Sequence, residues 1–71
     1  MSKTHTVNHM YRLVADPYTN NLTNFSNLLH SKGIGFISEY KKGIGLEYDV
    51  VIYIFFTPED VEKATYIYNQ L

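Results

Sequence analysis

One uninterrupted apolar run constrains the fold of this chain more than any other feature. Residues 46–57 read LEYDVVIYIFFT, and the stretch VVIYIFF within it contains no charged side chain. β-Branched and aromatic residues of this kind favour strands. A strand that is apolar on both faces is typical of a central position in a sheet. We therefore expect a strand here with a neighbouring strand on each side.

The two faces of this strand differ in their flanking residues. The even-numbered set, which we predict to face the core, is apolar apart from one Tyr hydroxyl: Tyr48, Val50, Ile52, Ile54 and Phe56. The odd-numbered set includes Glu47 and Asp49, whose charges are costly to bury without partners. Val51, Tyr53 and Phe55 belong to the odd set, so we expect them to point away from the core.

Two further strands and two helices are predicted around this segment. Residues 7–15 alternate, and Arg12 marks their solvent face, so the odd-numbered residues should be buried. A helix capped by Thr19 or Asn20 follows and ends before Gly33, with one apolar stripe: Leu22, Phe25, Leu28 and Leu29. Residues 34–41 should form the second strand.

The last helix has the clearest start signal. Thr57 suits the N-cap, Pro58 the first helical turn, and Asp60 completes a capping-box-like pattern. Its predicted inner stripe continues to the end of the chain and consists of Val61, Ala64, Tyr68 and Leu71, with Ile67 beside it.

The sequence GIG occurs twice, at residues 33–35 and 43–45. A phosphate-binding loop leads into the N-terminus of a helix. The first GIG instead ends a helix, and the second connects two strands. Both are therefore predicted to be structural turns in which glycine supplies a positive φ.

These elements give the order β-α-β-β-α, which predicts an α+β two-layer sandwich with a three-stranded antiparallel or mixed sheet and two helices on one face. If the first β-α-β unit is split, the third strand lies between the first and the second. This arrangement is ferredoxin-like without the last strand; the sequential order 1-2-3 is the alternative. The element order also resembles that of small bacterial modulators of recombination proteins, in topology alone.

Length and charge exclude several classes of protein. The chain of 71 residues fits one domain, 1–71, in which residues 1–6 are expected to be disordered. A net charge of −1 disfavours binding to duplex DNA. Neither a membrane span nor a signal peptide is expected, so the predicted location is cytoplasmic.

No catalytic, cofactor or metal site is predicted. His5 and His9 fall on an extended segment, where residues four apart lie about 13 Å from each other. The carboxylates of Glu39, Glu47 and Asp49 are expected to solvate the end of a strand. The serines lack a nucleophile signature such as G-x-S-x-G.

The outward face of the predicted sheet is the candidate binding surface. It is expected to be apolar with charges at its border, and monomers seldom expose such a surface. The residues predicted to contact a partner are Met10, Arg12, Val14, Ile37, Val51, Tyr53 and Phe55.

These expectations favour a small non-enzymatic protein that binds and regulates or inhibits a protein partner. Phage or plasmid accessory proteins and antitoxins have this size. One alternative is a module that binds single-stranded nucleic acid by stacking bases on Tyr53 and Phe55. A second alternative is a structural homodimer, since an open edge strand invites pairing.

Overall fold

A computed structural model describes residues 11–18 and 21–71, and all structural statements below concern these residues. The elements follow the order β1 (Arg12–Ala15), α1 (Leu22–Ser31), β2 (Phe36–Lys41), β3 (Val50–Phe55) and α2 (Pro58–Asn69). The predicted α+β class and the β-α-β-β-α order are confirmed. Met10 and the tail at residues 1–6 lie outside the described residues.

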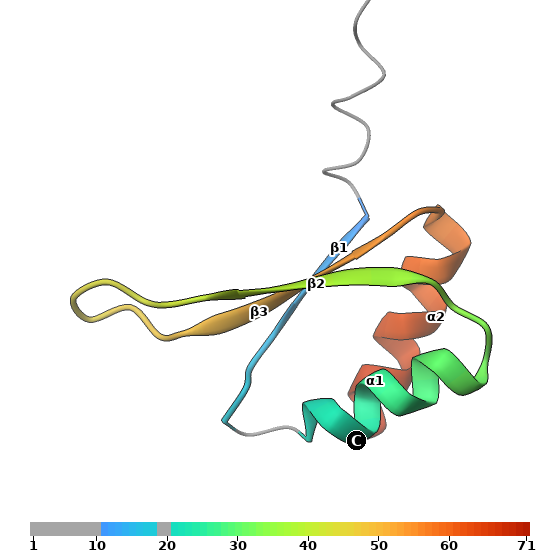
Figure 1. Cartoon of the computed structure of the whole chain (residues 1–71), viewed down its shortest axis with the longest axis horizontal. Coiled ribbons are helices and arrows are strands. Elements are labelled where there is room, and N and C mark those ends of the chain that lie inside the picture. Colours follow the sequence, from blue (N-terminus) through green and yellow to red (C-terminus); the bar gives the residue numbers. More distant parts are fainter. Residues whose placement is uncertain (1–10, 19–20) are drawn as a thin grey trace, which may run out of the picture.

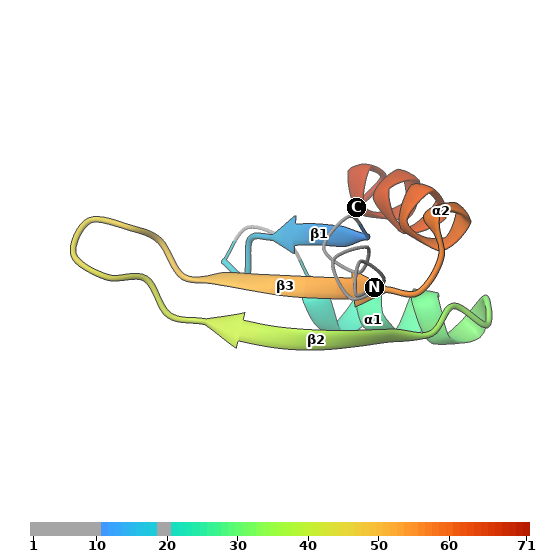
Figure 2. The ribbon, with the colours of Figure 1, turned by 90° about the horizontal axis from the view of Figure 1, so that it is seen from above.

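The sheet has the split order β1-β3-β2, and both strand pairs are antiparallel. β3 is therefore central, as its apolar sequence indicates, and Figure 2 shows it between the other two strands. Leu13 and Ser38 lie opposite Tyr53 on the two sides of β3. Residues directly opposite one another share a face, so this register decides which side chains meet on each side of the sheet.

Both helices pack on one face of the sheet, and the β2–β3 hairpin extends beyond them (Figure 1). The core lies between the helices and that face. Its buried members are Ala15, Phe25, Leu29, Ile34, Tyr53, Phe55 and Ala64. Aromatic rings pack against one another there. The centroid of the Phe25 ring lies 4.9 Å from that of Tyr53 and 5.4 Å from that of Tyr68, both in edge-to-face geometry. Edge-to-face contacts of this kind stabilise a small core.

The helix ends agree with local sequence signals to within a few residues. The Thr57 side chain accepts a hydrogen bond from the Asp60 N–H at 3.1 Å, so the predicted cap of α2 is confirmed. α1 is capped by Asn21, whose side chain accepts from the Asn24 N–H at 2.9 Å, and not by Thr19 or Asn20. The predicted extension of α2 to Leu71 was wrong, because the helix ends at Asn69.

The second GIG forms the turn of the hairpin. Gly45 has a φ of +65°, which residues with a Cβ seldom adopt. A Cβ on Gly43 would overlap the backbone carbonyl of Glu47, so only glycine fits there. This loop occupies residues that the sequence pattern assigned to the third strand, and β3 begins at Val50.

Candidate functional site: the open face of the sheet

One face of the sheet is not covered by any described element. Arg12, Ile54 and Ile37 lie opposite one another across the three strands, and the next row consists of Val14, Ile52 and Glu39. We call the apolar members of this face the aliphatic patch: Val14, Ile37, Val50, Ile52 and Ile54. Val14 is 59% exposed and Ile37 is 55% exposed, whereas the residues of the central strand are half-buried.

The structure corrects the predicted orientation of β3. Val51, Tyr53 and Phe55 were expected to point outward, but they face the helices. Tyr53 is only 2% exposed and Phe55 only 1%, and Val51 packs against the core. Arg12, Val14 and Ile37 do lie on the open face, as expected. Their role in binding a partner remains a prediction.

The reversal of β3 has a physical reason. Glu47 and Asp49, which marked the odd face as polar, precede the strand and therefore do not report its orientation. Within the strand both faces are apolar, so the size of the side chains decides between them. The Tyr53 ring packs against Phe25 of α1, and its hydroxyl shares a hydrogen bond with Ser26 Oγ at 2.9 Å. The Phe55 ring stacks on that of Tyr53 in the same core. The smaller aliphatic residues are left on the open face.

A phenylalanine extends the apolar surface beyond the patch. Phe56 directly follows β3 and is 60% exposed. Its ring lies 3.8 Å from the position that a Cβ of Gly35 would occupy, so it lies against the backbone at the start of β2. This ring is the aromatic member of the open face that the sequence pattern had assigned to the core.

Charges of both signs border the patch along β2. Glu39 lies opposite Ile52, and Lys41 lies opposite Val50. Both side chains are exposed, and neither forms an ion pair with another described residue. Arg12 occupies the opposite border, on β1.

The β2–β3 hairpin carries a second apolar surface at its tip. Leu46 is 99% exposed, Tyr48 is 85% exposed and Ile44 is 79% exposed. Figure 1 shows this tip far from both helices. The sequence pattern missed it, because Leu46 and Tyr48 were assigned to the predicted strand.

A cluster of two tyrosines and one aspartate fixes the base of the hairpin. Asp49 Oδ2 accepts hydrogen bonds from the hydroxyls of Tyr40 at 2.6 Å and Tyr18 at 2.7 Å. Asp49 Oδ1 accepts from the Gly43 N–H at 2.7 Å. The cluster therefore joins the β2–β3 loop to the loop after β1, and Asp49 has a specific structural role instead of only solvating a strand end.

These bonds shift the acidities of both partners. The hydroxyls of Tyr40 and Tyr18 and the Gly43 amide stabilise the carboxylate and lower the pKa of Asp49 from 3.8 to about 2. The same bond to the Asp49 carboxylate, assisted by Tyr18, raises the pKa of Tyr40 above its ordinary value of 10.0. Asp49 is therefore ionised and Tyr40 neutral across the physiological range, which suits a structural role.

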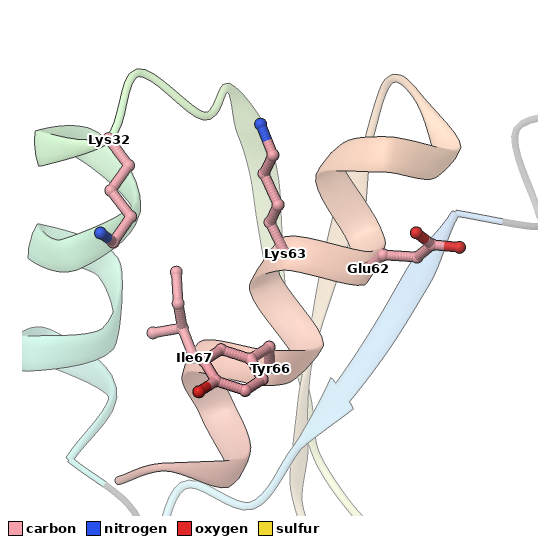
Figure 3. A pocket seen from close by; sticks show the side chains of 5 residues that line it. All are labelled: Lys32, Glu62, Lys63, Tyr66 and Ile67. Carbon is pink, nitrogen blue, oxygen red and sulfur yellow. The ribbon is translucent and has the colours of Figure 1, made fainter.

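A hollow of about 510 Å³ lies between the two helices. Figure 3 shows Ile67 pointing from α2 toward α1, while Glu62 points away from the gap. The ammonium groups of Lys32 and Lys63 do not converge with Glu62 or the Tyr66 hydroxyl on a common point (Figure 3). Acid–base or nucleophilic chemistry requires such convergence, so this hollow is not the favoured candidate site.

The residues considered for metal binding are not assembled into a site within the described part of the chain. In residues 11–18 and 21–71, no group of three or more His, Cys, Asp or Glu side chains is placed to hold a metal ion. His5 and His9 lie outside these residues. The ring of His30 packs against that of Phe36 at 5.0 Å.

Within the same residues, no helix combines the length and the apolar character needed to cross a membrane.

Comparisons with protein-family models, with curated proteins and with solved structures find no match to this chain.

Proposed function

We propose that this chain is a small non-enzymatic regulator or inhibitor that binds a protein partner through the aliphatic patch. The observation that supports the proposal is a sheet face with five aliphatic residues and no described element over it. Burying apolar surface contributes about 25 cal/mol per Å², and a contiguous exposed patch usually marks an interaction site. The partner surface we expect is itself aliphatic in the centre, because the patch offers no polar group there.

The border of the patch suits a protein better than a nucleic acid. Arg12 and Lys41 are accompanied by Glu39, so these border charges have an excess of one positive charge, whereas a surface that follows a phosphate backbone needs several. Base stacking on the sheet depended on Tyr53 and Phe55, and both rings are in the core. The nucleic-acid alternative thereby loses the residues on which it was based.

The test compares contact through the sheet with contact through the helices. A photo-crosslinking amino acid is introduced at Ile37, on the open face, or at Tyr66, which is 69% exposed on α2. Crosslinking in cells that produce the protein should yield one partner from position 37 and not from position 66. The partner is then purified, and its affinity is measured for wild type, Ile37→Glu and Val14→Glu.

Each glutamate should weaken the complex by at least about tenfold, the size of effect that a central apolar contact produces. Circular dichroism verifies the fold, which exposed positions should preserve. Tyr66→Glu is the matched control and should bind like wild type. The proposal is wrong if the crosslink arises from Tyr66 alone, or if Ile37→Glu and Val14→Glu bind the partner as tightly as wild type does.

A further inference from the structure

The outer edge of β2 is a free pairing surface among the described residues. β3 pairs with β2 on one side, and no described strand pairs on the other. β2 has six residues, whereas β1, at the opposite edge, has four. An open edge of this length offers a row of backbone donors and acceptors to another strand.

The backbone groups that face outward can be deduced from one hydrogen bond. The Phe55 N–H donates to the Tyr11 carbonyl at 2.8 Å, so Phe55 directs its backbone groups toward β1. Backbone groups alternate between the two edges of a strand. Ile54 therefore directs its groups toward β2, and its partner Ile37 directs its own back toward β3. By the same alternation, Ser38 and Tyr40 direct their N–H and C=O groups toward the free edge.

Side chains select one register for an antiparallel pairing of β2 with itself. If Ser38 faces Tyr40 of the second copy, Glu39 faces Glu39 and the like charges repel. If Ser38 faces Ser38, Glu39 faces Ile37. If Tyr40 faces Tyr40, each Glu39 faces Lys41 of the other copy, and two opposite-charge pairs form at once.

The third register also satisfies the backbone. Tyr40 faces its own counterpart through outward N–H and C=O groups, and Ser38 faces Lys42, the residue that follows the end of β2. The Glu39–Lys41 pairs then occupy the intervening non-hydrogen-bonded positions, where opposite side chains approach most closely. The two Tyr40 rings lie side by side on the other face, each held by its bond to Asp49.

The arrangement of the helices permits this pairing. Figure 1 shows that β2 starts beside the helices and ends away from them, so the two helical layers would lie at opposite ends of the joined sheet without colliding. Both open faces stay uncovered.

We infer that this chain forms a two-fold symmetric dimer with a second copy of itself through the β2 edge, centred on Tyr40 and joined by reciprocal Glu39–Lys41 pairs. The product is a continuous six-stranded sheet with both aliphatic patches on one side. This inference does not depend on the proposed function, because four of the five patch residues lie on β1 and β3, outside the dimer contact: Val14, Val50, Ile52 and Ile54.

The test is sedimentation equilibrium on charge-reversal variants. Glu39→Lys places lysine opposite lysine, and Lys41→Glu places glutamate opposite glutamate, so each variant alone should raise the dimer dissociation constant by about tenfold or more. A mixture of the two should form a heterodimer, and Glu39→Lys/Lys41→Glu should dimerise like wild type. The matched control is Glu62→Lys, which makes the same change of net charge on α2 and should leave dimerisation unchanged.

Ser38→Pro provides a test that does not rely on charge. The substitution removes one outward N–H and retains the hydrogen bonds to β3. Proline is tolerated at such a position of an edge strand, where the N–H faces outward. The folded variant should therefore be monomeric. A wild type that stays monomeric up to roughly millimolar concentration refutes the dimer, and Glu39 and Lys41 then protect the edge from pairing. A dimer that survives both single reversals and is broken by Val14→Glu, on β1 at the opposite edge of the sheet, refutes the β2 contact and places self-association on the open face.

Discussion

The orientation of β3 predicts different roles for two consecutive phenylalanines. Phe55 is 1% exposed and Phe56 is 60% exposed, although the two residues are of the same type and adjacent in the sequence. We expect Phe55→Ala to destabilise the fold far more than Phe56→Ala. The pair is its own matched control, because the substitution is chemically the same at both positions.

The magnitudes follow from the buried areas. A fully buried aromatic side chain removes about 150–250 Å² from water, worth roughly 4–6 kcal/mol at about 25 cal/mol per Å². Phe→Ala substitutions in cores cost about 3–5 kcal/mol. Phe56 has about two fifths of its surface covered, which limits its loss to roughly 1–2 kcal/mol. The expected difference is therefore about 2–3 kcal/mol.

Urea unfolding followed by circular dichroism measures this difference. A chain of 71 residues has a free energy of unfolding of roughly 4–11 kcal/mol. In the upper part of this range, Phe55→Ala is folded without urea and its unfolding free energy can be measured. In the lower part, the variant is already partly unfolded without urea. Phe55→Leu and Phe56→Leu provide a milder pair in the second case. If Phe56 proves the more costly position in both pairs, the even face of β3 is the core face and the orientation described above is wrong.

Four further predictions concern local structure. Gly43→Ala should lower the melting temperature by several degrees, because the added Cβ overlaps the backbone of Glu47. In Gly35→Ala the added Cβ meets only the Phe56 ring at 3.8 Å, so the melting temperature should change little. Equal shifts in the two variants would contradict the close approach of the backbone at Gly43. In an NMR titration, the Asp49 carboxyl should titrate with a pKa of about 2. The contribution of Asp49 to the free energy of unfolding is therefore complete above about pH 4 and decreases as the pH falls toward 2. An ordinary carboxyl pKa would exclude the cluster in solution. Tyr40 should ionise above the ordinary tyrosine range in an absorbance titration, and Asp49→Asn should return it to that range. Thr57→Ala should cost about 1 kcal/mol through loss of the α2 cap, and an unchanged unfolding free energy would show that the cap contributes nothing.

The strand orientation shows where reasoning from sequence reached its limit. The rule that charges mark the solvent face worked for β1, where Arg12 lies within the strand. It failed for β3, because Glu47 and Asp49 belong to the hairpin loop. Predicting the start of a strand a few residues too early does not change the predicted topology. Here, however, it counted two loop charges as residues of the strand, so the wrong face was predicted to be exposed.

The tyrosine–aspartate cluster was missed for a different reason. Tyr18, Tyr40 and Asp49 are separated by up to 31 positions in the chain and carry no motif. Only the meeting of the loop after β1 with the base of the hairpin brings their oxygens within hydrogen-bonding distance. No local pattern marks such a contact.

The sequence by itself determined the elements and their order, because caps, periodicity and turn glycines act within a few residues. Thr57 starts α2, Gly33 follows the end of α1, and the apolar run from Val50 onward requires a central strand. The tertiary structure alone decided which face of that strand meets the helices, since both faces are apolar and only packing separates them. The core beneath the helices accommodates the rings of Tyr53 and Phe55, and that fit leaves Ile52 and Ile54 on the open face.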